Sequence, residues 1–327
     1  MNSNPYRGRL APSPTGALHL GNIRTFLITW LHCRFHQGEL VMRMEDLNIE
    51  RLKEGAVESI YEDLIWLGFD WDIGAGLHHL DTTKREDPSF IQSNCTEEYE
   101  KVFETLKREK AIYPCSCTRK ELSQIQSAPH EHEQFYPNIC RDHWPDELSA
   151  EKSKGHTISW RYKLNDDIDS FNDGFYGNYS HPLSKWSGDF VIAQKSNKVA
   201  YQLAVVIDDS RQGISKVIRA DDLLDSTLRQ IALYKKLTLT APQFHHIPLV
   251  VGEDGKRLAK RHGDYKISSL RKMGIKANKI LGYLAYTCGW LNQIEELSIQ
   301  DCLSIFDYTK VPKNKIVVKS IEETLLN

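Results

Sequence analysis

The fold is restricted first by a segment near the N-terminus, where a short apolar strand gives way to a loop and then to a helix. Pro12 and Pro14 break the strand, because proline has no backbone N–H to continue a sheet. Apolar residues then recur with helical spacing over residues 23–35, and a strand over 40–45 and a helix over 49–67 follow. This order of strand, loop, helix and strand predicts the start of a doubly wound parallel α/β sheet.

The loop and the start of the helix together form a candidate anion-binding site. Gly16 and Gly21 allow the backbone to approach a ligand closely, and the N-terminus of a helix attracts phosphate. His19 lies at the helix entry, where its imidazole can donate a hydrogen bond to a phosphate oxygen. A structural turn capped by a histidine is the alternative interpretation of the same residues.

Composition places few limits on function. The 327 residues predict about two domains, and 40% hydrophobic and 26% charged residues are typical of a folded globular chain. The net charge of −2 does not indicate a nucleic-acid-binding protein, so any RNA contact would use local basic residues. Such a basic patch, or alternatively a solvated loop, is formed by Lys256, Arg257, Lys260, Arg261 and Lys266. We find no secretory signal and no apolar run of about 18 residues, and we expect a cytoplasmic protein with no membrane segment.

The middle of the chain differs from both ends. Residues 113–190 carry clustered Cys, His, Tyr and Asp with few long apolar runs, and we interpret them as an insertion folded partly around a metal. An apolar strand pattern returns over 200–207 and is followed by a helix over about 226–237. A glycine-containing basic loop, 252–263, precedes a mainly helical C-terminal region. The parallel sheet is therefore expected to resume after the insertion.

Seven cysteines occupy positions 33, 95, 115, 117, 140, 288 and 302, and the odd number without a secretory signal argues against a disulfide framework. Cys115 and Cys117 bring two thiolates together, and Cys140 follows. Three thiolates and one oxygen or nitrogen donor complete a tetrahedral zinc site, and four protein ligands would make the metal structural. The fourth donor stays open between Tyr136 and one of the nearby histidines, which are His130, His132 and His143.

The N-terminal string Arg9-x-Ala-Pro-Ser-Pro-Thr-Gly-x-Leu-His-Leu-Gly-Asn resembles the first signature of class I glutamyl-tRNA synthetases, with HxGN in place of the class-wide HIGH motif. The resemblance implies that this loop binds ATP and that His19 stabilises the charge developing on the α-phosphate. Residues 255–263 resemble the second signature, with Arg257 to Arg261 in the place of KMSKS. Lys260 is then implied to neutralise the phosphates and the leaving pyrophosphate. Ala259 departs from the usual serine, for which we expect reduced efficiency at worst.

A site for glutamate must satisfy two carboxylates and one ammonium, and the planar fork of arginine suits a carboxylate. Arg9 lies at the end of the first predicted strand and Glu45 at the end of the second, and such ends meet at the carboxyl edge of a parallel sheet. The resemblance implies that Arg9 and Ser13 hold the substrate carboxylates and that Glu45 holds the α-amino group. It also implies that Tyr201 and Arg219 complete the pocket. Without the resemblance, Tyr201 would be interpreted as a core aromatic residue and Arg219 as a surface charge.

The resemblance therefore implies three sets of residues. ATP, with Mg²⁺, is expected to contact Pro12, Thr15, Gly16, His19, Gly21, Asn22, Arg257 and Lys260, of which His19 and Lys260 are the predicted catalytic residues. Glutamate is expected to contact Arg9, Leu10, Ala11, Pro12, Ser13, Glu45, Tyr201 and Arg219. Zn²⁺ is expected at Cys115, Cys117, Tyr136 and Cys140, because short relatives of these synthetases carry a zinc-binding insertion with a CxC, Tyr and Cys ligand set.

The short relatives are also favoured by the rest of the chain. Only 64 residues follow Gly263, which is enough for a helical stem-contacting region and too little for an anticodon-binding region as well. The strings 201–204 and 222–227 resemble the truncated paralogues, the glutamyl-queuosine tRNA(Asp) synthetases. That resemblance implies activation of glutamate by ATP without tRNA and transfer of glutamate to queuosine at the wobble position of tRNA(Asp), by a monomer. The alternatives are a genuine glutamyl-tRNA synthetase that charges tRNA(Glu) and a non-catalytic regulatory paralogue.

On the same resemblance we predict a class I synthetase Rossmann-type fold in four segments. Residues 1–112 and 194–245 would form the two halves of the Rossmann catalytic domain, 113–193 the zinc-binding insertion, and 246–327 the KMSKS-like loop and the helical stem-contact region.

Overall fold

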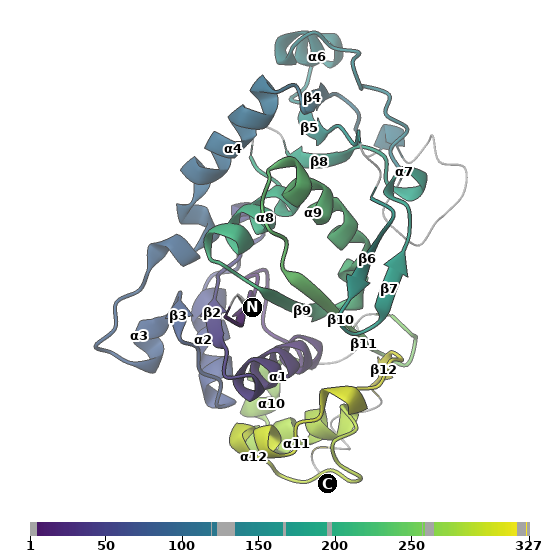
Figure 1. Ribbon diagram of the computed structural model, residues 1–327. Coiled ribbons are helices and arrows are strands. Elements are labelled where there is room, and N and C mark those ends of the chain that lie inside the picture. The colour runs from purple at the N-terminus through teal and green to yellow at the C-terminus, as the bar shows by residue number, and fades with distance from the viewer. Residues whose placement is uncertain are drawn as a thin grey trace.

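The computed structural model describes residues 5–118, 120–122, 135–165, 168–194, 198–256, 258, 265–318 and 325 of the chain. Figure 1 shows an elongated molecule with three parts along its length: an antiparallel sheet at one end, a parallel sheet in the middle and a group of helices at the other end. None of the helices in these described segments is long and apolar enough to cross a membrane.

The parallel sheet is built from strands of both halves of the chain. In the first half β1 pairs with β2 and β2 with β3, all parallel; in the second half β9 pairs in parallel with β10. The two groups join where the backbone N–H of Ser215 donates to the carbonyl oxygen of Arg7 at 3.0 Å. Strand order therefore runs outward in opposite directions from the junction of β1 and β9, which is where doubly wound sheets bind ligands. The strands are β1 (Arg7–Leu10), β2 (Glu39–Met42), β3 (Ile73–Gly74), β9 (Lys216–Ala220) and β10 (Gln243–Ile247).

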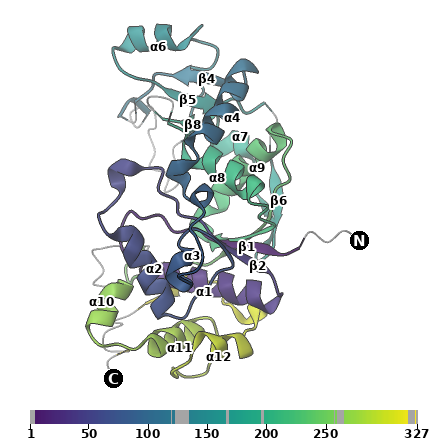
Figure 2. The same cartoon turned by 90° about the vertical axis from the view of Figure 1, so that its left-hand side faces the viewer.

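Both faces of this sheet are covered because its strands are apolar on alternate sides. Leu40 and Met42 pack with α1 (Leu20–Phe35), whereas Val41 between them packs with α8 (Tyr201–Arg211). Figure 2 shows α8 and α9 (Leu224–Lys236) on one side of the sheet and α1 on the other.

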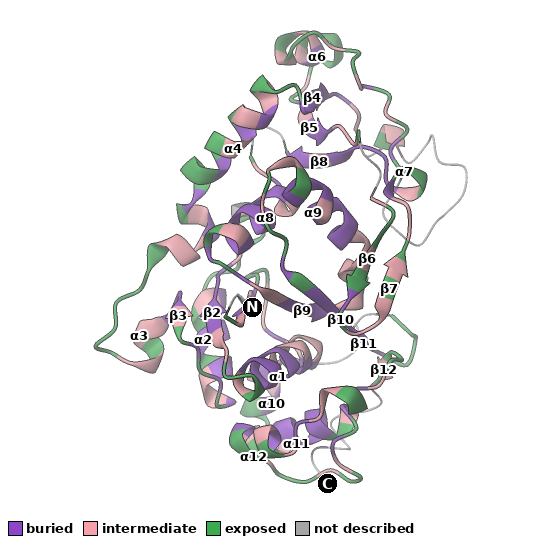
Figure 3. Cartoon of the chain, viewed as in Figure 1, coloured by how far each residue is buried: buried purple, intermediate pink, exposed green. Residues whose placement is uncertain are grey.

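The strand predicted over 200–207 is wrong, since these residues begin helix α8. Residues 203–209 are buried all round between the sheet and neighbouring helices, as the purple of α8 shows in Figure 3. A short run that is apolar on every side carries no periodicity by which a helix is distinguished from a buried strand. The helix predicted over 49–67 is also interrupted: a 3-10 turn at Ile49–Arg51 precedes α2 (Ala56–Trp66).

The antiparallel sheet lies in the segment interpreted as an insertion. Its order is β4 (Ile112–Cys115), β5 (Ser159–Tyr162) and β8 (Phe190–Ala193). A separate hairpin, β6 (Ser170–Asp173) and β7 (Gly177–Ser180), turns back onto the parallel sheet, where the N–H of Gly174 donates to the carbonyl oxygen of Phe244 at 2.8 Å. A Cβ on Gly174 would lie 2.2 Å from the ring of His245, so the close approach of hairpin and sheet requires glycine.

The C-terminal region is mainly helical, as predicted, and it also contributes a strand. Its elements are α10 (Ile267–Lys272), α11 (Ala277–Thr287), α12 (Ile299–Ser304) and β12 (Ile316–Val317). Strand β12 pairs in parallel with β11 (Val250–Val251), which precedes the glycine-containing basic loop. The other α-helices in the described segments are α3 (Leu77–Leu80), α4 (Thr96–Arg108), α6 (Glu147–Lys154) and α7 (Leu183–Trp186).

Candidate active site

A pocket of about 460 Å³ opens at the junction of β1 and β9. It brings together residues from the loop after β1, from α1, from the segment after β2, from the start of α8 and from β9. Of the residues predicted from sequence, it is lined by Arg9, Ala11, Pro12, Ser13, Thr15, Gly16, His19, Gly21, Asn22, Glu45, Tyr201 and Arg219. Leu10 is fully buried and is not part of this lining. Arg257 and Lys260 lie outside the described residues, as do Ala259 and Arg261.

His19 is the N-cap residue of α1, and its ring has a defined orientation. Nδ1 accepts the backbone N–H of Asn22 at 3.3 Å, and the Asn22 side chain accepts the backbone N–H of His19 at 3.2 Å. In a neutral imidazole whose Nδ1 accepts, the proton is on Nε2, which makes Nε2 a donor. The first turn of α1 contains no acidic side chain, so nothing there offsets the positive end of the helix dipole. The start of α1 is therefore suited to an anion.

Arg9 is held by a carboxylate from the other half of the chain. Its Nε donates to Asp209 on α8 at 3.1 Å, and Nη1 of Arg43 donates to the same oxygen at 2.6 Å. All three side chains are at most 6% exposed. Burial by itself would raise the pKa of Asp209, but Arg43 and Arg9 outweigh burial and lower it. Asp209 is therefore an anion that fixes both arginines.

Arg43 and Asp209 carry no predicted role from the sequence. The signal available was the Asp208-Asp209 pair directly after the apolar run 203–207, because charges in a buried segment require partners.

Glu45 supplies a carboxylate at the side of the pocket next to Arg9. Its Oε1 accepts from Nη2 of Arg43 at 3.1 Å. Burial raises the pKa of Glu45, and the attraction of Arg43 and Arg9 offsets only part of that effect. A buried carboxylate with a raised pKa is stabilised by an additional cation, such as the ammonium of an amino acid.

Arg219 lines the pocket from β9 and is held by polar side chains. Its Nη2 donates to Thr227 at 2.7 Å and to Gln230 at 2.8 Å, and its Nε donates to His246 at 3.0 Å. For Nη1, the described part of the chain provides no hydrogen-bond partner, although this nitrogen is buried. An unpaired buried guanidinium nitrogen beside a pocket is suited to a carboxylate ligand. Tyr201, the first residue of α8, lies in the same wall, and burial raises its pKa.

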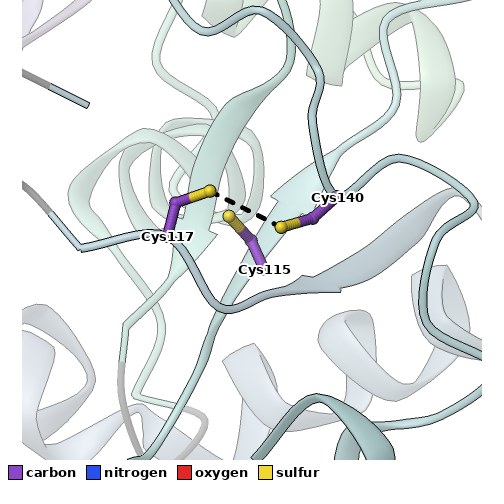
Figure 4. Close-up of side chains that lie close together, drawn as sticks. All are labelled: Cys115, Cys117 and Cys140. Atoms are coloured by element: carbon purple, nitrogen blue, oxygen red, sulfur yellow. Dashed lines mark hydrogen bonds between the residues drawn. The ribbon is translucent and has the colours of Figure 1, made fainter. Parts of the chain in front are cut away.

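The three cysteines predicted as metal ligands converge in the insertion, away from this pocket. Their sulfur atoms all lie within 4.8 Å of one another, and Cys117 and Cys140 are 3.5 Å apart (Figure 4). The hydroxyl of Tyr136 lies 3.4 Å from the sulfur of Cys115 and 3.9 Å from that of Cys117. Sulfur atoms around one tetrahedral Zn²⁺, at about 2.3 Å from it, are themselves roughly 3.8 Å apart. The donor set therefore fits a tetrahedral metal ion.

The structure also bears on the alternative fourth ligands. The side chain of His143 is exposed and packs against Trp144, outside the group of three sulfur atoms. His130 and His132 lie outside the described residues. Arg161 donates to the sulfur of Cys115 at 3.2 Å, and its guanidinium lies 3.5 Å from the ring centre of Tyr136, so a positive charge already stands beside the cluster. All seven cysteines are free thiols.

Known proteins are similar to this chain in sequence and in fold. The family described as tRNA synthetases class I (E and Q), catalytic domain, matches residues 6–324. The chain is 40% identical over 312 residues to a glutamyl-Q tRNA(Asp) synthetase of Symbiobacterium thermophilum, with 94% of each chain covered. It is 38% identical over 313 residues to a protein of the same name in Nitratidesulfovibrio vulgaris, with 95% of each chain covered. A crystal structure of a glutamate tRNA ligase from Elizabethkingia meningosepticum, in complex with its amino acid, is similar with a TM-score of 0.77 and 25% identity, covering 97% of this chain and 68% of that chain.

Proposed function

Because the chain belongs to the class I tRNA synthetases of the glutamate and glutamine type, in the group of the glutamyl-Q tRNA(Asp) synthetases, we propose that it activates glutamate with ATP and transfers it to queuosine in tRNA(Asp). The predicted fold class, a class I synthetase α/β fold, is confirmed, and the protein is a ligase. The observation that carries the proposal is the pocket that joins a helix N-terminus to two buried arginines and to Glu45, whose side chain is 8% exposed.

The activation step needs positioning and charge neutralisation more than proton transfer. An oxygen of the substrate α-carboxylate attacks the α-phosphorus of ATP, the bond to the bridging oxygen breaks, and pyrophosphate leaves with the electron pair. His19 would donate Nε2–H to a non-bridging oxygen of the α-phosphate while the start of α1 attracts the phosphates. Mg²⁺ would arrive bound to ATP. Lys260 and Arg257 keep their predicted roles at the phosphates.

Substrate selection is proposed for the other end of the pocket. Arg9 and Arg219 would hold the two carboxylates of glutamate, Ser13 and Tyr201 would add hydrogen bonds, and Glu45 would pair with the ammonium. Glutamine lacks the second negative charge, so the arginine opposite its amide would be left buried without a counter-ion. That loss disfavours glutamine.

The transfer of glutamate to tRNA is the second step. The activation step before it is proposed to need no tRNA. A hydroxyl oxygen of queuosine would attack the carbonyl carbon of the adenylate, the bond to the phosphate oxygen breaks, AMP leaves, and the hydroxyl proton is released. The support for tRNA(Asp) carrying queuosine is the name of the relatives that are 40% and 38% identical. The support for the alternative acceptor, tRNA(Glu), is the structural similarity to a glutamate tRNA ligase at 25% identity.

Zinc is proposed for Cys115, Cys117, Tyr136 and Cys140. None of these four residues lines the pocket, so the ion would stabilise the insertion and take no part in the reaction. Metal analysis of the purified protein should give about one equivalent of zinc, and its absence would contradict the proposed ligand set. The active unit is proposed to be a monomer, which sedimentation measures directly.

The decisive experiment is glutamate transfer with purified components. Labelled glutamate should attach to tRNA(Asp) that bears queuosine, and not to tRNA(Asp) lacking it or to tRNA(Glu). Labelling of tRNA(Glu) would instead identify a genuine glutamyl-tRNA synthetase. Glutamate-dependent exchange of pyrophosphate into ATP without tRNA tests the first step separately, and its absence would indicate a non-catalytic paralogue.

A further inference from the structure

A buried series of hydrogen bonds leads from the β6–β7 hairpin to the pocket. Oδ2 of Asp173, at the end of β6, lies 2.6 Å from Nδ1 of His246 on β10, and both side chains are fully buried. Nε2 of His246 in turn lies 3.0 Å from Nε of Arg219. On the paired strands β9 and β10, Arg219 and His246 are direct partners in register. The hairpin carboxylate is therefore one histidine away from a residue of the pocket wall.

The direction of these hydrogen bonds is fixed by their two ends. Arg219 can only donate, so Nε2 of His246 must accept. Nδ1 then carries the proton and donates it to Asp173, whose oxygens also accept the backbone N–H groups of His246, Phe175 and Tyr176 at 2.9 to 3.0 Å. Burial, together with the nearby Arg219, lowers the pKa of His246 to about 4, although Asp173 opposes this shift. The imidazole is therefore neutral near pH 7 and present as a single tautomer.

The same contacts determine where the guanidinium of Arg219 points. Thr227 and Gln230 hold Nη2, and His246 holds Nε. Nη1 is left without a partner among the described residues. A planar guanidinium fixed at two of its nitrogens cannot rotate, so the direction of the third is set before any ligand arrives.

We propose that Asp173 and His246 are positioning residues that orient Arg219 toward a carboxylate of glutamate and thereby set the affinity for the amino acid. The inference rests on the proposed function, because it takes Arg219 to contact glutamate. It also gives the β6–β7 hairpin a role in substrate binding. This hairpin lies inside the segment 113–193, which was predicted to be an insertion outside the catalytic domain.

The sharpest test is Asp173→Asn, which preserves shape and reverses one hydrogen bond. The amide oxygen can still accept the backbone N–H groups, and the amide nitrogen then donates to Nδ1 of His246. The imidazole proton moves to Nε2, which can then donate to the hydroxyl oxygen of Thr227 at 2.9 Å but can no longer accept the N–H of Arg219, so the hydrogen bond that holds Nε of Arg219 is lost. In pyrophosphate exchange without tRNA, KM for glutamate should rise on the order of 10-fold to 100-fold, while KM for ATP changes less than about two-fold.

A matched control is available in the same region. Asp225 also binds a histidine, His181, at 3.0 Å and accepts from Tyr179 at 2.7 Å, but it does not line the pocket. Asp225→Asn should leave both KM values unchanged within about two-fold. An equal rise of KM for glutamate in both variants would overturn the inference, because it would show a general effect of losing a carboxylate near the hairpin.

Arg219→Ala separates this inference from the proposed function. If Arg219→Ala leaves KM for glutamate unchanged, the assignment of the pocket fails and the inference fails with it. If Arg219→Ala raises KM and Asp173→Asn does not, only the positioning role is overturned, even where Asp173→Asn lowers the melting temperature. The expected result is that Asp173→Asn adds less than about two-fold to the effect of Arg219→Ala. Nitrogen NMR of His246 should show the proton on Nδ1 in the wild type and on Nε2 in Asp173→Asn.

Discussion

The amino-acid pocket and the cysteine cluster are both made of buried polar side chains, but the chain connects them differently. The pair Arg9–Asp209 joins residues 200 positions apart, and the pair Asp173–His246 joins residues 73 apart. The contacts of Cys117 with Cys140 and of Cys115 with Tyr136 span 23 and 21 positions. The pocket therefore exists only when both halves of the parallel sheet are assembled, whereas the cluster depends on one local segment.

The two regions also differ in what neutralises their charge. In the pocket, Arg9 and Arg43 share the single carboxylate of Asp209, so a positive charge is left over. Arg9, Arg219 and Glu45 then offer two cations and one anion, which match the two carboxylates and the ammonium of glutamate. In the cluster, three thiols and a phenol surround a space suited to a cation. Damage to the pocket should therefore strongly reduce activation, and damage to the cluster should lower stability while activation persists.

The largest effect on activation is expected for Arg9→Ala. It removes a substrate-binding cation and one of the two partners of Asp209. Loss of one member of a buried, hydrogen-bonded charge pair costs about 3–4 kcal/mol, so kcat/KM for glutamate in pyrophosphate exchange should fall roughly 100-fold to 1,000-fold. Arg7→Ala, on the same strand but outside the pocket lining, should change it less than about three-fold. Activation of glutamate at normal rates by Arg9→Ala would refute the carboxylate assignment.

A smaller loss is expected at His19, where two substitutions separate two roles. Asn caps a helix well but does not extend as far as imidazole. Ala provides neither the cap nor a donor for the phosphate. Both His19→Asn and His19→Ala should lower kcat by about 100-fold through loss of the phosphate donor. Only His19→Ala should also lose about 1 kcal/mol of unfolding free energy, measured by urea denaturation. Equal stability of the two variants would show that the cap contact with Asn22 contributes nothing measurable.

A pH-dependent effect is expected from Glu45. Its pKa is raised above the ordinary 4.5, so falling pH neutralises it earlier than a surface glutamate. KM for glutamate should therefore rise as pH falls toward that pKa, with KM for ATP unchanged, in assays between about pH 5 and pH 8. The free energy of unfolding depends on pH in the opposite direction. The folded state binds this proton more tightly than the unfolded state, so the contribution of Glu45 to the free energy of unfolding falls as pH rises. In Glu45→Gln, KM should be high and independent of pH, and a retained pH dependence would assign the effect to another group.

The smallest effect on activation is expected from Cys140→Ala. This variant should lose its zinc and melt at a lower temperature, because the insertion loses its cross-link. Assayed below that melting temperature, pyrophosphate exchange should stay within about three-fold of wild type, since no cluster residue lines the pocket. Cys95→Ala, which removes a buried thiol outside the cluster, should retain zinc. If the variant lost pyrophosphate exchange together with its zinc, the pocket and the cysteine cluster would be shown to be coupled.

The sequence allowed the pocket wall to be predicted because the residues that touch substrates occur in short strings with fixed spacing. Twelve predicted residues, from Arg9 to Arg219, line one cavity. What could not be predicted is the set of side chains that hold those residues in place. Asp209 and Asp173 act across distances that spacing does not encode, and Asp209 follows an apolar run whose helix was taken for a strand. The β1–β2 pairing was predictable, whereas the return of the β6–β7 hairpin to β10 depends on tertiary packing at Gly174.

The pairing of β12 with β11 bears on the order in which the pocket forms during translation. Val250, on β11, belongs to the pocket wall, yet β11 is bonded to residues 316–318, which leave the ribosome long after it. A nascent chain that has already exposed the N-terminal phosphate-binding loop and the start of α1 still lacks the partner of this strand. We therefore expect the nucleotide side of the pocket to become competent only after residues 316–318 have emerged from the ribosome and paired with β11.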